Sequence, residues 1–94
     1  MDIKEILQKE GITEHNALLG QGLLTAYARV SHYEAVCRNF QEKYGLSFDE
    51  MKLRMESKTN EEDFQEEEDF IDWEFANVSL KWWLERVKEL KSAA

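Results

Sequence analysis

The sequence predicts an all-α protein built on a long antiparallel helical hairpin. Proline is absent and glycine occurs only four times in 94 residues, so few positions interrupt a helix. Two long segments repeat their apolar residues every three or four positions, which is the spacing of a helix face that packs along another helix. We expect one domain over residues 1–94, a length near the lower limit for a self-sufficient core.

The N-terminal part of the chain predicts a short helix followed by a connector. Asp2 begins a capping-box pattern, and a helix over about residues 2–10 would place three aliphatic side chains on one side. Gly20 and Gly22 lie close together and favour a break in the chain. We therefore expect residues 1–22 to contain this short helix and a connector with a single helical turn.

The first long helix is predicted over about residues 23–44. Its apolar stripe steps alternately by three and four positions through Leu23, Ala26, Val30, Tyr33, Cys37, Phe40 and Tyr44. Gly45 follows as a left-handed helix stop. Ser47 and Glu50 then form a capping box, which predicts a short helix over about residues 48–56.

The last helix is predicted over about residues 65–90, after an acidic loop over residues 56–64 with Thr59 and Asn60 as candidate caps. One apolar face is expected to pack against the first long helix and comprises Trp73, Ala76, Leu80, Trp83, Val87 and Leu90. A second face lies about 140° round the helix and comprises Ile71, Phe75, Val78 and Trp82. Either the N-terminal segment, with Leu18 and Leu19, or a second copy of the chain could cover this candidate dimer face.

Negative charge is concentrated in one segment. Ten acidic residues lie between Glu56 and Glu74 against a single base, Lys58, so this segment carries a formal charge of −9 while the whole chain carries −8. Such a local field favours a basic partner protein. It argues against direct binding of nucleic acid, because phosphate affinity comes mostly from lysine and arginine.

Catalytic motifs are not visible in the sequence. Glu66, Asp69 and Asp72 have spacings that could present carboxylates on one helix face, so a metal-dependent helical hydrolase is an alternative interpretation. Cys37 lies in the apolar stripe and is expected to be a buried, inert thiol. Neither a signal peptide nor a membrane span is apparent. We expect a cytoplasmic, non-enzymatic protein with no cofactor and no metal.

Two stretches resemble a group of small helical proteins of bacteria and archaea. They are Tyr44-Gly-Leu-Ser-Phe-Asp-Glu50 and, after the acidic run, Asp72-Trp-Glu-Phe-Ala76. The pattern is occupied here by Tyr33, Phe40, Lys43, Tyr44, Gly45, Phe48, Asp72, Trp73 and Glu74, and the resemblance spans about residues 23–90. Members of this group are commonly encoded beside a second small gene, in a layout similar to a toxin–antitoxin pair. The resemblance implies a helical fold and an antitoxin-like role, and it leaves the N-terminal 20 residues outside.

These observations together favour a protein-binding module whose acidic and aromatic segment covers a basic, nucleic-acid-handling surface of a partner, such as the product of the neighbouring gene. The acids would steer the partner and pair with its bases, and the phenylalanines would anchor it. The candidate partner-binding residues are Glu62, Asp63, Phe64, Glu66, Glu67, Asp69 and Phe70. A structural homodimer, in which the acids only maintain solubility, is a further alternative.

Overall fold

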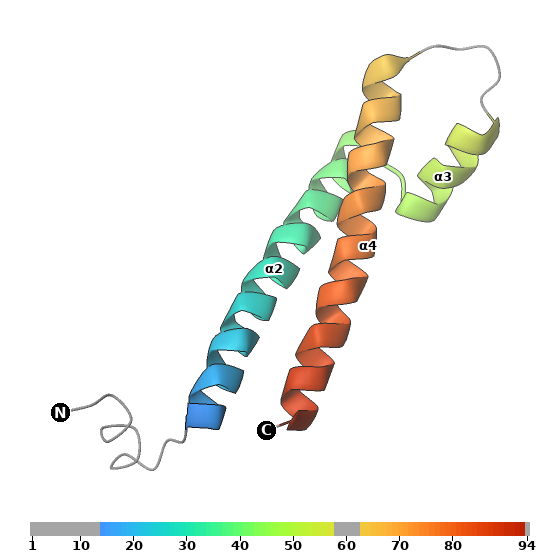
Figure 1. The fold of residues 1–94 in the computed structure, drawn as a ribbon. Coiled ribbons are helices and arrows are strands. Elements are labelled where there is room, and N and C mark those ends of the chain that lie inside the picture. The colour runs from blue at the N-terminus through green and yellow to red at the C-terminus, as the bar shows by residue number, and fades with distance from the viewer. Residues whose placement is uncertain (1–13, 58–62, 94) are drawn as a thin grey trace.

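The described part of the chain is an all-α hairpin with one short helix, α3, which confirms the predicted fold class. The computed structural model describes residues 14–57 and 63–93. Helix α2 spans Glu14–Tyr44, α3 spans Phe48–Ser57 and α4 spans Phe64–Ala93. Figure 1 shows α2 and α4 running antiparallel, so that the start of α2 and the end of α4 lie at the same end of the hairpin. The helix predicted over residues 2–10 lies outside the described residues.

The predicted break at Gly20 and Gly22 is wrong. Helix α2 starts at Glu14 and continues through both glycines without interruption. Because α4 extends to Ala93, the start of α2 has a helix to pack against, and a Cβ atom placed on Gly22 would lie 3.5 Å from Leu90 Cδ2. Packing along α4 therefore outweighs the cost of about 1 kcal/mol for each glycine in a helix.

The turn between α2 and α3 follows the predicted chemistry. Gly45 has a φ of 67°, and its N–H donates to the carbonyl of Gln41 at 2.8 Å, which ends α2 in the left-handed conformation. The N–H of Ser47 donates to Glu50 Oε1 at 3.0 Å, and the N–H of Glu50 donates to Ser47 Oγ at 3.2 Å. These two bonds confirm the capping box, and the bond from the Ser47 backbone lowers the pKa of Glu50.

Helix α4 begins within one residue of its predicted start at about residue 65. Its first residue is Phe64, and Asp63 provides the cap by accepting a bond from the N–H of Glu66 at 3.1 Å. The predicted helix over about residues 48–56 is confirmed, and it extends to Ser57, while Phe64, predicted as the end of the acidic loop, is the first residue of α4. Thr59, Asn60 and the rest of residues 58–62 lie outside the described part of the chain.

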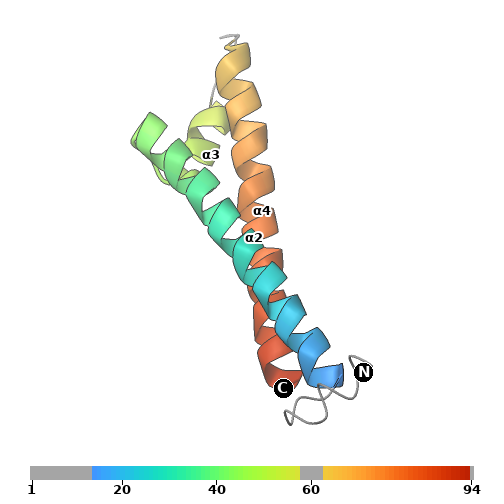
Figure 2. The same ribbon diagram turned by 90° about the vertical axis from the view of Figure 1, so that its left-hand side faces the viewer.

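The core is small, lies along the seam of the hairpin and extends to α3. Its buried apolar residues, within the described ranges, are Ala26, Met51, Trp73, Ala76 and Val87. The Trp73 side chain is only 1% exposed, and the rings of Phe40, Tyr44 and Phe48 surround it at centroid distances of 5.7–6.3 Å. Figure 2 shows α2 and α4 crossing and then diverging towards the end where α3 lies, which is the end that this aromatic cluster fills. The predicted hairpin face of α4 is thus confirmed.

Candidate functional site

The first turns of α4 contain most of the described acidic segment, and their carboxylates divide into buried and exposed groups. Glu66 and Asp69 are each only 6% exposed, whereas Glu67 and Glu68 are exposed to solvent. Asp63 caps the helix, and its carbonyl accepts the N–H of Glu67 at 3.1 Å. Negative charge in the first turn of a helix is also favoured by the helix dipole. This division separates the acids that are engaged within the chain from those that face solvent.

Asp69 is tied to the end of α2. Its Oδ2 atom accepts hydrogen bonds from Lys43 Nζ and Tyr44 Oη, both at 2.5 Å, and its Oδ1 atom accepts one from Gln65 Nε2 at 2.9 Å. The bond from Lys43, followed by that from Tyr44, lowers the pKa of Asp69. Burial, together with the bond to Asp69, raises the pKa of the Tyr44 hydroxyl. This carboxylate therefore holds the two long helices together.

Glu66 is tied to α3 in a similar way. Arg54 Nε lies 2.8 Å from Glu66 Oε1, and Arg54 Nη2 donates to Glu66 Oε2 at 3.4 Å. Because Arg54 is about half exposed while Glu66 is buried, the pair closes the edge of the contact between α3 and α4. Two of the predicted partner-binding acids thus serve contacts within the chain.

The two phenylalanines of the segment also differ in their surroundings. Phe70 is partly buried and stacks on Phe48 of α3, with ring centroids 5.7 Å apart and planes only 4° from parallel. Phe64 is 72% exposed. Of the seven predicted partner-binding residues, Asp63, Phe64 and Glu67 are exposed, Glu66, Asp69 and Phe70 are engaged within the chain, and Glu62 lies outside the described residues.

The exposed residues at the start of α4 form one continuous face. Phe64, Glu67, Glu68 and Ile71 are spaced i, i+3, i+4 and i+7, so their side chains lie on one side of the helix. All four are exposed, and Ile71 is 65% exposed. We refer to these four residues as the acidic face. It combines two carboxylates with two large apolar side chains that have no cover among the described residues.

The second apolar face of α4, defined by Ile71, Phe75, Val78 and Trp82, is also open. Their side chains are 65%, 65%, 61% and 51% exposed. Phe75 makes one edge contact with Tyr33 of α2, at a centroid distance of 6.1 Å. Leu18, one of the residues considered as an internal cover, is itself 63% exposed. Within residues 14–57 and 63–93, therefore, this face remains largely uncovered.

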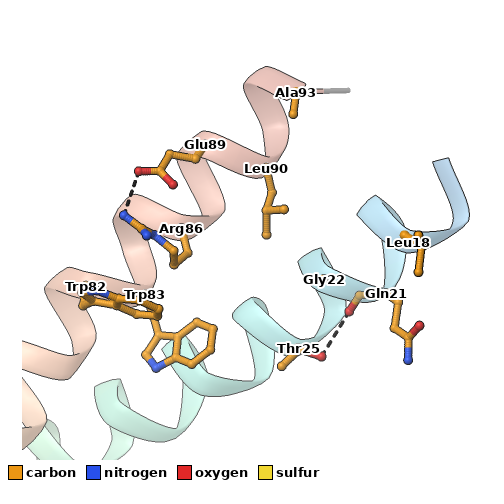
Figure 3. Close-up of a pocket in the computed structure, with 10 residues that line it drawn as sticks. All are labelled: Leu18, Gln21, Gly22, Thr25, Trp82, Trp83, Arg86, Glu89, Leu90 and Ala93. Carbon is orange, nitrogen blue, oxygen red and sulfur yellow. Dashed lines mark hydrogen bonds and ion pairs between the residues drawn. The ribbon is translucent and has the colours of Figure 1, made fainter. Parts of the chain in front are cut away.

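A groove adjoins the second face at the open end of the hairpin. It has a volume of about 610 Å³ and lies between the start of α2 and the end of α4. Figure 3 shows Trp83 projecting between the two helices, with Leu90 and Gly22 beyond it. Arg86 lies over the Trp82 ring at 4.6 Å and pairs with Glu89 at 2.7 Å. Trp82 belongs to both surfaces, so the groove continues the second face.

The described residues contain no group of three or more His, Cys, Asp and Glu side chains placed to hold a metal ion. Of the residues considered for a hydrolase, Glu66 and Asp69 are paired with Arg54 and Lys43, while Asp72 is exposed. Cys37 is partly buried, and burial raises the pKa of its thiol. None of the described helices is both long and apolar enough to cross a membrane.

Comparisons with protein-family models, curated proteins and solved structures gave no match for this chain.

The burial of Glu66 and Asp69 is indicated by their positions in the sequence, although the surrounding run of acidic residues suggests that they are exposed. Stepping back from the buried Ala76 and Trp73 by alternate three and four positions leads to Asp69 and then to Glu66. These two acids therefore continue the hairpin face. Their bases, however, come from α2 and α3, and no local pattern indicates which cations would meet them.

Proposed function

We propose that the chain is a non-enzymatic, antitoxin-like binding module that uses the acidic face of α4 to cover a basic surface of a partner protein. The observation that carries this proposal is the exposure of Phe64 and Ile71 on either side of Glu67 and Glu68. Large apolar side chains that remain exposed beside charges are typical of protein interaction sites.

The electrostatics support a basic partner of this kind. Lys43 and Arg54 compensate Asp69 and Glu66 within the chain, whereas Glu67 and Glu68 are exposed on the same turns. The exposed carboxylates would raise the rate of association with a positively charged surface, and Phe64 would anchor the complex once formed. Because the sequence resembles antitoxin-like proteins, the proposed partner is the product of the neighbouring gene. The region that the acidic face would cover is a nucleic-acid-handling surface of that protein.

Calorimetric titration of the purified neighbouring gene product tests the proposal. We expect Glu67→Gln combined with Glu68→Gln to weaken binding about tenfold at low salt, with a smaller difference at high salt because ions screen exposed charges. The matched control removes two exposed acids from α2, Glu34 and Glu42, and should leave affinity nearly unchanged.

Phe64→Ser separates anchoring from steering. Truncating an aromatic residue that is a hot spot of an interface costs at least about 2 kcal/mol, so we expect binding to weaken roughly 30-fold at both salt concentrations. Phe64 is 72% exposed, so the substitution should leave the helical content unchanged by circular dichroism. Wild-type affinity for both the Phe64 variant and the double acid variant would refute the proposal, as would a lack of binding by the wild-type chain.

A further inference from the structure

The second face of α4 requires a partner other than α2. The hairpin buries Trp73, Ala76 and Val87 on one side of α4, while Ile71, Phe75, Val78 and Trp82 lie about 140° round the helix and are more than half exposed. A helix with two apolar faces has two packing partners in a stable assembly. The charges beside the second face indicate what the second partner is.

Four exposed charged residues follow one edge of the second face at intervals of seven. They are Glu67, Glu74, Lys81 and Lys88. The two acids precede the two bases, and the pattern is centred between residues 77 and 78. Reversing the helix direction about this centre places Glu74 opposite Lys81 and Glu67 opposite Lys88. The edge is therefore complementary to a reversed copy of itself.

We propose that this face binds a second copy of the chain, with the two α4 helices packed antiparallel about a two-fold axis. In this arrangement Ile71 meets Trp82 of the second copy and Phe75 meets Val78, because both pairs are centred between residues 76 and 77. The centre of the apolar pattern and the centre of the charged pattern thus differ by only one residue, which is about 1.5 Å along the helix.

A parallel pair would place like charges together. In a parallel coiled coil, a flanking residue of one helix contacts the residue five positions later in the other helix. Glu67 of one copy would then contact Asp72 of the second copy, and Lys81 would contact Arg86. Both contacts are repulsive. The charge pattern therefore selects the antiparallel orientation as well as the identity of the partner.

The area available fits a weak but specific dimer. At the exposed fractions observed, the four side chains offer about 500 Å² per copy, or roughly 1,000 Å² for the pair. This lies at the lower limit for specific interfaces, before the stems of the flanking charged residues are added. We therefore expect self-association at about micromolar concentrations.

Sedimentation equilibrium of the full chain tests the interface. The wild type should approach a mass of about 22 kDa, twice the chain mass of 11.1 kDa, as concentration rises. Ile71→Glu should weaken self-association at least tenfold. Leu24→Glu is the matched control, because Leu24 is 73% exposed and lies two residues before the buried Ala26, on the opposite side of α2. It should leave the dimer intact.

Charge reversal tests the orientation at low salt. Glu74→Lys alone should weaken the dimer about tenfold, and adding Lys81→Glu should restore it to within about threefold, because each reversed charge then meets a reversed partner. Both residues are exposed, so circular dichroism should remain unchanged. A double variant weaker than the single one would overturn the antiparallel arrangement.

A wild-type chain that stays monomeric at all concentrations would overturn the proposal. A monomer that loses thermal stability on Ile71→Glu would instead assign the face to the N-terminal residues of the same chain. Ile71 and Glu67 belong both to the acidic face and to this dimer, so the dimer and the complex with the neighbouring gene product exclude each other at these two residues. Because these measurements use the chain alone, they can fail independently of binding to the neighbouring gene product.

Discussion

Replacing Asp69 by asparagine is expected to lower the free energy of unfolding by about 2–3 kcal/mol. The substitution keeps the shape of the side chain but removes its charge and one of its acceptor oxygens. In the wild type, Asp69 is 6% exposed and accepts bonds from Lys43, Tyr44 and Gln65. The variant has a single, uncharged acceptor oxygen, so Lys43 and Tyr44 lose their charged acceptor at the junction of α2 and α4.

The magnitude follows from the burial of each partner. Lys43 is about half exposed, so water screens its ion pair and we assign it at most about 1 kcal/mol. The bond from the partly buried Tyr44 hydroxyl to a charged acceptor contributes about 1.5–3 kcal/mol. For a chain of this size, a loss of 2–3 kcal/mol corresponds to a fall in melting temperature of roughly 10–20 °C.

Urea and thermal unfolding followed by circular dichroism provide the assay, at one fixed protein concentration because self-association adds to stability. Asp72→Asn is the matched control: it removes an exposed carboxylate three residues later on the same helix and should change stability by less than about 0.5 kcal/mol. Tyr44→Phe should cost about 1–2 kcal/mol, and its effect should be smaller in the Asp69→Asn background. An Asp69→Asn variant as stable as the Asp72→Asn control would refute the structural role of this carboxylate.

Three further predictions concern the fold. Hydrogen bonds lower the pKa of Asp69 in the folded chain, so its contribution to the free energy of unfolding is present at neutral pH and declines as the pH falls below about 4. When melting temperature is measured against pH, the wild type should therefore lose stability below about pH 4 faster than the Asp69→Asn variant does. Gly45→Ala should lower the free energy of unfolding by about 1 kcal/mol in urea, because φ is 67°; the cost is limited to this backbone strain, since no neighbouring atom would touch the added Cβ. Gly20→Ala, in an open helical position, should instead raise the free energy of unfolding by about 0.5–1 kcal/mol. Trp73→Ala should cost about 3–5 kcal/mol and remove most of the helical signal, because it empties the centre of the aromatic cluster.

The sequence predicts best the features that depend on neighbouring residues. The stop at Gly45 and the capping box of Ser47 and Glu50 require only local backbone chemistry, and both are confirmed. The hairpin face of α4 is confirmed for the same reason, since a step of three and four positions is a local property of a helix.

The errors arise where distant residues decide the outcome. Gly20 and Gly22 favour a break locally, but the end of α4 offers Leu90 as a packing partner and the helix continues. Asp69 belongs to a run of charges that suggests solvent exposure, yet Lys43 and Tyr44 approach from α2 and bury it. Contacts of this kind depend on how the helices meet, which the spacing within one helix does not specify.

Site-specific photocrosslinking tests most directly whether the acidic face is the surface that binds the partner protein. A photoreactive phenylalanine analogue placed at Phe64, on the acidic face, should form an adduct with the neighbouring gene product. The same analogue at Leu24, which is equally exposed but lies on the outer side of α2, should form none. Adducts from position 24 and none from position 64 would contradict the account.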